Sequence, residues 1–309
     1  MARKFLISRV ALAVALSSGL AISAMPGVAA AKAKKDEAPK PEFSPEFVKA
    51  AGPLEKAMGE ALKKIPAQGA GAADMTAAKD AFDASVGGDG KAAFAAAEAV
   101  ATTPDDKRTL GSWMRNYAIF GQDTPLRQKA NVLMIDSGKL SAQEAGRINF
   151  DAGINAYNAK DYQGAIRFMT GAKAAGFADP DGNLDKVLDV SYRQTNNPAA
   201  ALELARQNLA AAKASGTKPS ETAIRTALQA SLDGKQLAPS VDYAVMLSEE
   251  YPSQQSWNTA IAVVRALAPL QPQEYIDLMR LMDRTNSFTS NVDYGEFIDL
   301  GTTQGMNSP

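Results

Sequence analysis

The chain has 309 residues, of which 46% are hydrophobic, 22% are charged and only 7% are aromatic. It contains neither cysteine nor histidine, which excludes disulfide cross-links and removes both the residue most used for acid–base catalysis near neutral pH and the commonest metal ligand. We therefore expect no catalytic residues, no metal site and no cofactor.

The first 30 residues predict a cleaved secretory signal peptide. Arg3, Lys4 and Arg9 form a basic start, Val10–Ile22 is a short apolar run, and Val28–Ala30 offers small residues for cleavage. A run of about 13 residues is shorter than the roughly 20 needed to span a bilayer. We expect an exported, periplasmic protein with no membrane span in the mature chain.

Removal of residues 1–30 takes away three positive charges and no negative one, so the net charge moves from −1 to −4. A mildly acidic chain argues against nucleic acid as a partner, because binding phosphates requires clustered lysine and arginine. It also argues against electrostatic adhesion to anionic lipid.

The charged, proline-rich residues 31–45 predict a disordered linker. From there helical patterns alternate with breaks rich in glycine and proline, first in an N-terminal helical region over 46–104. Thr124 before Pro125 predicts a helix N-cap followed by proline in the first turn. Ser141 and Glu144 predict a capping box, in which each side chain hydrogen-bonds the other's backbone N–H.

The helices pair into hairpins at a regular interval. Second helices are predicted to begin near Asp161, Pro198, Pro239 and Gln273, at gaps of 37, 41 and 34 residues. A period in the thirties with two helices per unit is typical of a helical solenoid.

Asn149 to Ala172 resembles one tetratricopeptide repeat. Gly153, Tyr162, Ala165 and Ala172 fall on the glycine, the aromatic residue and the two alanines of that family's motif. The resemblance implies an all-α fold, a right-handed superhelix of antiparallel helical hairpins, in which small residues lie where helices cross. A generic alanine-rich helical bundle remains the alternative fold.

The resemblance weakens along the chain. Leu188, Tyr192 and Ala201 match a second unit in part, Trp257 suits a later one, and residues 220–252 hardly match. We assign a repeat array to 105–301 and a flexible tail to 302–309. Within the repeat array, Val292–Leu300 predicts one more first helix, which we expect to be completed by a hairpin from elsewhere.

Two loops carry superficial motifs. Asp179–Asp185 lacks the glycine and glutamate positions of a calcium loop, and Val86–Lys91 lacks the spacing of a phosphate loop. Both are predicted to be turns between helices.

In the family that the motif resembles, first-helix residues line the binding groove. Carried onto this sequence, these positions are Tyr157 and Asn158, then Arg193 and Gln194. Aromatic, amide and guanidinium groups suit the capture of a peptide or helix, so we expect a scaffold that binds a protein or peptide in the cell envelope. The alternatives are an accessory module of a cell-wall-cleaving enzyme and a carrier of a small ligand.

Overall fold

The computed structural model describes residues 41–67, 69–267, 269–288 and 291–303. The expected signal peptide, most of the expected linker and residues 304–309 of the expected tail lie outside the described residues.

The described residues form fourteen α-helices and no strand. Their bounds are α1 Pro45–Leu62, α2 Ala72–Ser85, α3 Gly90–Glu98, α4 Pro104–Phe120, α5 Thr124–Asp136, α6 Ala142–Asn158, α7 Tyr162–Ala174, α8 Asn183–Gln194, α9 Pro198–Ala214, α10 Glu221–Asp233, α11 Leu237–Glu250, α12 Gln254–Leu267, α13 Pro272–Arg284 and α14 Asn291–Thr303. The predicted second helices correspond to α7, α9, α11 and α13, each of which begins within two residues of the expected position.

Side-chain caps fix several of the helix starts. The predicted capping box at the start of α6 is present, since Ser141 accepts from the Glu144 N–H and the Glu144 carboxylate accepts from the Ser141 N–H. The predicted N-cap at Thr124 is wrong. Asp123 is the N-cap of α5, because its carboxylate reaches the N–H of Leu126 at 2.9 Å.

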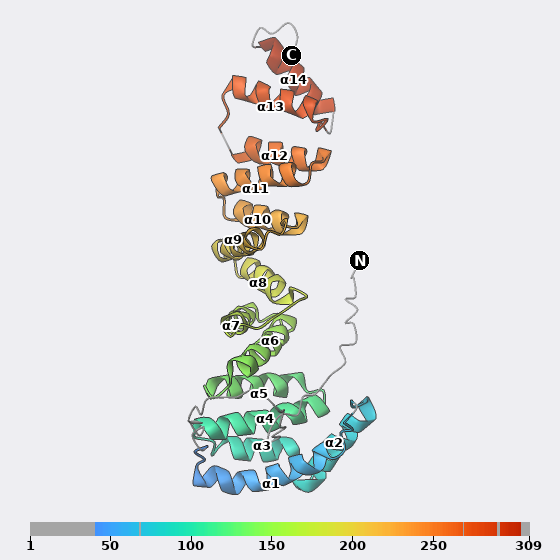
Figure 1. The fold of residues 1–309 in the computed structure, drawn as a ribbon, viewed down its shortest axis with the longest axis vertical. Helices are drawn as coiled ribbons and strands as arrows, with labels where there is room; N and C mark the ends of the chain where they lie inside the picture. Colours follow the sequence, from blue (N-terminus) through green and yellow to red (C-terminus); the bar gives the residue numbers. More distant parts are fainter. Residues whose placement is uncertain (1–40, 68, 268, 289–290, 304–309) are drawn as a thin grey trace, which may run out of the picture. The chain divides into compact units, whose positions relative to one another are not determined.

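The chain divides into two compact units, residues 1–178 and 179–309. Within each unit, helices that follow one another pack together: α4 on α5 and α6 on α7 in the first, α9 on α10 and α10 on α11 in the second (Figure 1). The predicted all-α array of antiparallel helical hairpins is therefore confirmed.

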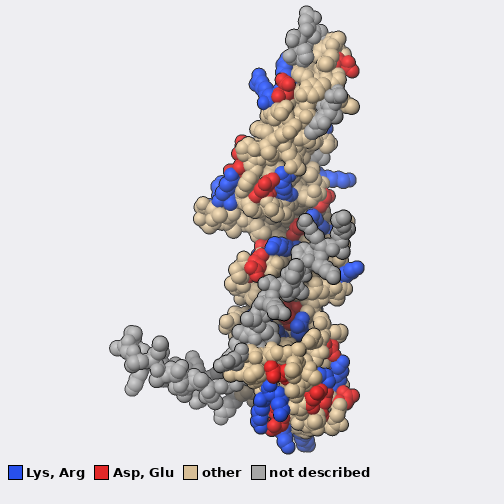
Figure 2. Space-filling model, turned by 90° about the vertical axis from the view of Figure 1, so that its right-hand side faces the viewer, with Lys and Arg blue, Asp and Glu red and all other residues tan. Residues whose placement is uncertain are grey.

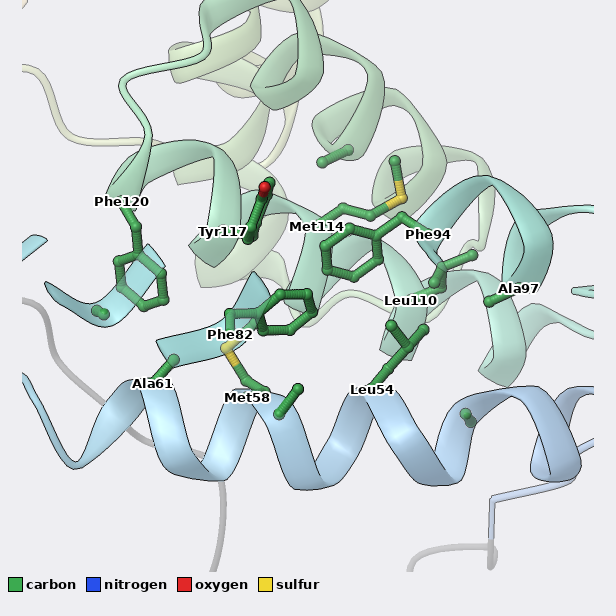
Figure 3. Close-up of a cluster of buried hydrophobic side chains, with 14 of the residues drawn as sticks. Leu54, Met58, Ala61, Phe82, Phe94, Ala97, Leu110, Met114, Tyr117 and Phe120 are labelled. Atoms are coloured by element: carbon green, nitrogen blue, oxygen red, sulfur yellow. The ribbon is translucent and has the colours of Figure 1, made fainter. Parts of the chain in front are cut away.

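The core of unit 1 is built on aromatic side chains. The rings of Phe82, Phe94 and Tyr117, from α2, α3 and α4, lie with centroids 4.9–5.4 Å apart. Leu54 and Met58 of α1 close this cluster from below, as Figure 3 shows. It joins the non-repeat helices α1–α3 to the first hairpin, so residues 45–98 and α4 share one core.

The small residues of the repeat allow close helix crossings, as the sequence predicts. A Cβ atom on Gly153 of α6 would lie 2.9 Å from the Met169 side chain of α7. Gly111 of α4 has the same role, since a Cβ there would lie 2.6 Å from Met134 and 3.0 Å from the Ala130 carbonyl oxygen of α5. The 2.9 and 2.6 Å distances are shorter than real Cβ atoms make, so a side chain at either glycine would force Met169 or Met134 to move.

Two buried clusters lie among the described residues of unit 2. The larger one joins α9 to α12, around Leu202, Ile224 and Leu247. The smaller one joins α12, α13 and α14 and includes Phe297. Ile298, the next residue on α14, is 58% exposed. The predicted extra first helix is thus present as α14, and its completion by another hairpin stays a prediction.

Candidate functional site

The predicted groove residues lie at the C-terminal ends of two first helices. Tyr157 and Asn158 belong to α6 in unit 1, and Arg193 and Gln194 belong to α8 in unit 2. Asn158 is exposed, whereas Tyr157 is half-buried and its ring lies 6.1 Å, edge to face, from the ring of Tyr162. Part of the Tyr157 side chain is therefore buried against the second helix of its own hairpin.

The second pair differs in the same way. Gln194 is exposed and Arg193 is largely exposed, but the Arg193 guanidinium pairs with the buried carboxylate of Asp189 one turn earlier. Arg193 is thus available to solvent on one side only. Asn158 and Gln194 are the most accessible of the four predicted residues.

The first helices of the first two hairpins are tied by ion pairs. Arg108 of α4 contacts Glu144 of α6 at 2.9 Å, and Arg115 of α4 contacts Asp151 of α6 at 3.4 Å. Both pairs join residues 36 apart in sequence. Equal offsets mean that α4 and α6 run parallel in one register, as first helices of successive repeats must, and present their polar side chains to one face.

A cluster of arginine side chains lies on this face, where α4, α5 and α6 meet. We define the arginine cluster as Arg115, Arg127, Arg147, Asn131, Asp151 and Asn155. The Asp151 Oδ2 atom accepts from Asn131 Nδ2 at 2.9 Å and lies 3.4 Å from an Arg115 terminal nitrogen and 3.5 Å from Arg127 Nε. One carboxylate oxygen therefore contacts two guanidinium groups, through a long hydrogen bond from Arg115 and through an ion pair with Arg127 that lacks hydrogen-bond geometry.

The amides of the cluster orient the guanidinium groups. The Arg115 Nε–H donates to Asn131 Oδ1 at 3.0 Å, and an Arg127 terminal N–H donates to Asn155 Oδ1 at 2.6 Å. Asn131 and Asn155 are both buried, so they form the floor on which the arginines lie.

The cluster contains more positive than negative charge. Burial lowers the pKa of Arg115, the Asp151 charge raises it, and the nearby charges of Arg127 and Arg147 lower it again, with a net shift below the usual value. Elsewhere, on the face drawn in Figure 2, acidic and basic side chains are interspersed. The whole chain has a net charge of −1.

A hollow lies in unit 2, between α8, α9 and α10. It encloses about 270 Å³ and has an apolar floor that includes Leu204 and Ala205, with polar side chains such as Asp189, Asn208 and Thr226 around it. One carboxylate oxygen of Asp189 is buried and accepts no hydrogen bond. The volume is just below the usual range for small-molecule sites, roughly 300–1,000 Å³.

The motif comparison does not identify Arg115 or Arg127, and neither was predicted as a site residue. The usable signal was the repeated 36-residue offset of opposite charges, Arg108 with Glu144 and Arg115 with Asp151. The predicted Asn158 lies on the same face of α6 as Asp151 and Asn155, one turn beyond Asn155, because residues at i, i+4 and i+7 share a helix face.

Two further results bear on the kind of site. Within the described ranges, no three acidic side chains are placed to hold a metal ion. In the same ranges no helix combines the length and the apolar character needed to cross a membrane.

Comparisons with known proteins give a structural likeness. No family model matches the chain, and a search of curated proteins finds no significant match. A solved structure described as "Functional Characterization of Pseudomonas Aeruginosa pilF" is similar, at 12% sequence identity and a TM-score of 0.32, over 82% of this chain and 98% of that one. A likeness at this TM-score carries no argument about partners.

Proposed function

We propose that the chain is an exported, non-enzymatic scaffold that binds a protein or peptide of the cell envelope on the face of its first helices. The observation that carries this proposal is the common register of α4 and α6, which collects polar side chains from successive hairpins on one face. A face assembled in this way is suited to an extended partner that contacts several repeats in turn. The N-terminal pattern of residues 1–30 supports export to the periplasm.

Site-specific photo-crosslinking in the intact envelope tests the location of the binding face. A photoreactive amino acid is placed at Asn158, which is exposed on a first helix, and separately at Thr170, which is exposed on the second helix of the same hairpin. We expect a discrete crosslinked protein from position 158 and none from position 170. Equal crosslinking at both positions, or none at either, would contradict a binding face on the first helices.

Export has its own test. The N-terminal sequence of the protein recovered from the periplasmic fraction should begin after Ala30, and a chain that keeps residues 1–30 in the cytoplasm would contradict this part of the proposal.

A carrier of a small ligand is the second candidate, favoured by the hollow between α8, α9 and α10. Native mass spectrometry of the protein purified from the envelope separates the two, because a carrier retains a bound small molecule of constant mass. Enlarging Ala205 to Leu at the floor of the hollow should abolish that adduct, while the exposed control Ala210→Leu should leave it unchanged.

A further inference from the structure

The arginine cluster holds more positive charge than its neighbours neutralise. Arg115 and Arg127 pair with one carboxylate, Asp151, and the charge of Arg147 lies near enough to act on Arg115. Arg147 makes no ion pair within the part of the chain that the structure describes. The group therefore carries a local charge of about +2, since arginine stays protonated throughout the physiological range.

The hydrogen bonding of the cluster is incomplete as well. Arg127 Nε and Asn155 Nδ2 are buried and donate no hydrogen bond. Asn155 is only 4% exposed, and its oxygen is already taken by Arg127, so its amide group is fixed with the N–H₂ end unused. Buried donors without acceptors are rare in folded proteins and destabilise them.

The unused donors are next to side chains that a ligand can reach. The side chains of Arg115 and Arg127 keep 23% and 30% of their surface exposed, and Arg147 is exposed. A negatively charged group that arrives there would find guanidinium N–H groups from three helices, two of them oriented by buried amides.

We propose that the arginine cluster binds an oxyanion, the side-chain carboxylate of an acidic segment of the partner, with Arg115, Arg127 and Arg147 as its donors and Asn155 as a positioning residue. Guanidinium groups pair with carboxylates through two parallel hydrogen bonds, which gives both strength and orientation. Asp151 holds the arginines in place without saturating them, because its contacts with them are 3.4 and 3.5 Å long. This inference rests on the proposed function, since it names the chemistry of the partner for the same face.

Fluorescence anisotropy on the full chain tests the proposal. The probe is a labelled peptide of alternating glutamate and serine with an amidated C-terminus, and its matched control replaces every glutamate by glutamine. We expect the glutamate peptide to bind and the glutamine peptide to bind at least tenfold more weakly. Equal binding of the two peptides would overturn the proposal.

A pair of arginine variants locates the site. Arg147→Gln removes a charge from the cluster at an exposed position that makes no ion pair, and Arg206→Gln removes one from the exposed surface of α9 in unit 2. We expect Arg147→Gln to weaken binding of the glutamate peptide about tenfold, the loss typical of one charge-assisted hydrogen bond. Arg206→Gln should change it less than twofold, and a similar loss in both variants would show non-specific attraction and refute the site.

Asp151→Asn separates binding from structural support. Loss of this carboxylate frees two guanidinium groups, so the peptide should bind several-fold more tightly even if the free chain becomes less stable. Weaker binding in this variant would overturn the proposal, because it would mean that Asp151 takes part in holding the ligand.

The source of the anion is tested by competition. Inorganic phosphate is added at a concentration at which free glutamate does not displace the peptide. We expect that phosphate does not displace it either, and displacement by phosphate alone would assign the cluster to a free anion. If crosslinking at Asn158 succeeds while the glutamate peptide fails to bind, the scaffold function stands and only the acidic partner is refuted. If both fail, the proposed function is refuted with it.

Discussion

The buried carboxylate of Asp106 connects the first repeat to the chain before it. Its side chain is fully buried at the start of α4, and its carboxylate accepts four hydrogen bonds. The Ser44 N–H donates to Oδ1 at 3.1 Å, and the Ser44 hydroxyl and the N–H groups of Thr102 and Thr103 donate to Oδ2 at 2.8–3.0 Å. These bonds link the residues before α1 to the first residues of the repeat array.

The variant Asp106→Asn keeps the size of the side chain and removes its charge and one acceptor. The best orientation leaves the remaining oxygen facing three donors, which brings the new N–H₂ group against the Ser44 N–H. A lost bond to a charged group and two buried donors without acceptors together destabilise by about 2–4 kcal/mol. With an m-value of about 2 kcal/mol per molar urea, the midpoint of unfolding should fall by about 1–2 M.

Urea unfolding followed by Trp113 fluorescence measures this change. Trp113 packs against the core of unit 1, and Trp257→Phe removes the other tryptophan so that the signal comes from unit 1 alone. Asp80→Asn, at an exposed position of α2, is the matched control and should leave the midpoint unchanged. A midpoint for Asp106→Asn within 0.2 M of the parent, about 0.4 kcal/mol on the same scale, would refute the reasoning.

The pH dependence gives the same claim a second test. Burial acts to raise the pKa of Asp106, but the hydrogen bonds from Thr103 and Ser44 outweigh it and hold that pKa below its usual value of 3.8. A lowered folded-state pKa means that the carboxylate stabilises the fold above the unfolded-state pKa and that this contribution is lost as the pH falls through the folded-state pKa. The gap between the parent and Asp106→Asn should therefore narrow below about pH 4. A constant gap from pH 7 to pH 3 would contradict it.

Two further predictions concern packing and ionisation in unit 1. Gly111→Ala should destabilise by about 1–3 kcal/mol, because its methyl group would collide with Met134, whereas Gly59→Ala on α1, where no atom lies within 4 Å, should stabilise by about 0.5–1 kcal/mol; urea midpoints that move in the same direction for both would contradict the assignment of the crossing. Burial and the hydrogen bond to Asp83 raise the pKa of Tyr117 to about 12, so Tyr117 should ionise late in a titration of phenolate absorbance. Tyr117→Phe should reduce that late step, to which Tyr275, whose pKa burial also raises, contributes. Since the unfolded tyrosine ionises near pH 10, stability should fall as the pH rises from about 10 to 12 in the parent and less in the variant.

Helix positions could be predicted because their signals are local. Ser141 and Glu144 form a cap from a four-residue pattern, and the small residue Gly153 allows the crossing of α6 with α7 within one repeat. Thr124 shows the limit of that approach. A threonine before a proline fits the sequence pattern of an N-cap equally well. In the structure, however, it is the carboxylate of Asp123 that accepts the hydrogen bond from the free N–H of Leu126.

The site could be predicted only in outline. Asn158 lies on the face of α6 that carries Asp151 and Asn155, whereas Arg193 has its own partner four residues away in Asp189, an i,i+4 pair that the sequence already displays. Arg115 and Arg127 could not be predicted as site residues, because their contacts depend on the register between helices whose contacting residues are 20–36 apart in sequence. That register is set by how α4, α5 and α6 pack, which no single repeat contains.

Helix caps and close helix crossings lie in the hairpins around the arginine cluster. Two buried donors without acceptors and an under-neutralised charge destabilise the free chain by an amount on the order of a few kcal/mol. The caps at Asp106 and Ser141 and the glycine crossing at Gly111 do not touch the exposed ends of the arginines, so they can stabilise the hairpins without competing for a ligand. An acidic partner would supply the missing acceptors, and binding to the folded state alone raises the free energy of unfolding by about 2.7 kcal/mol when the ligand is present at 100 times its Kd. The cluster is therefore a source of instability in the free protein that becomes a source of affinity in the complex.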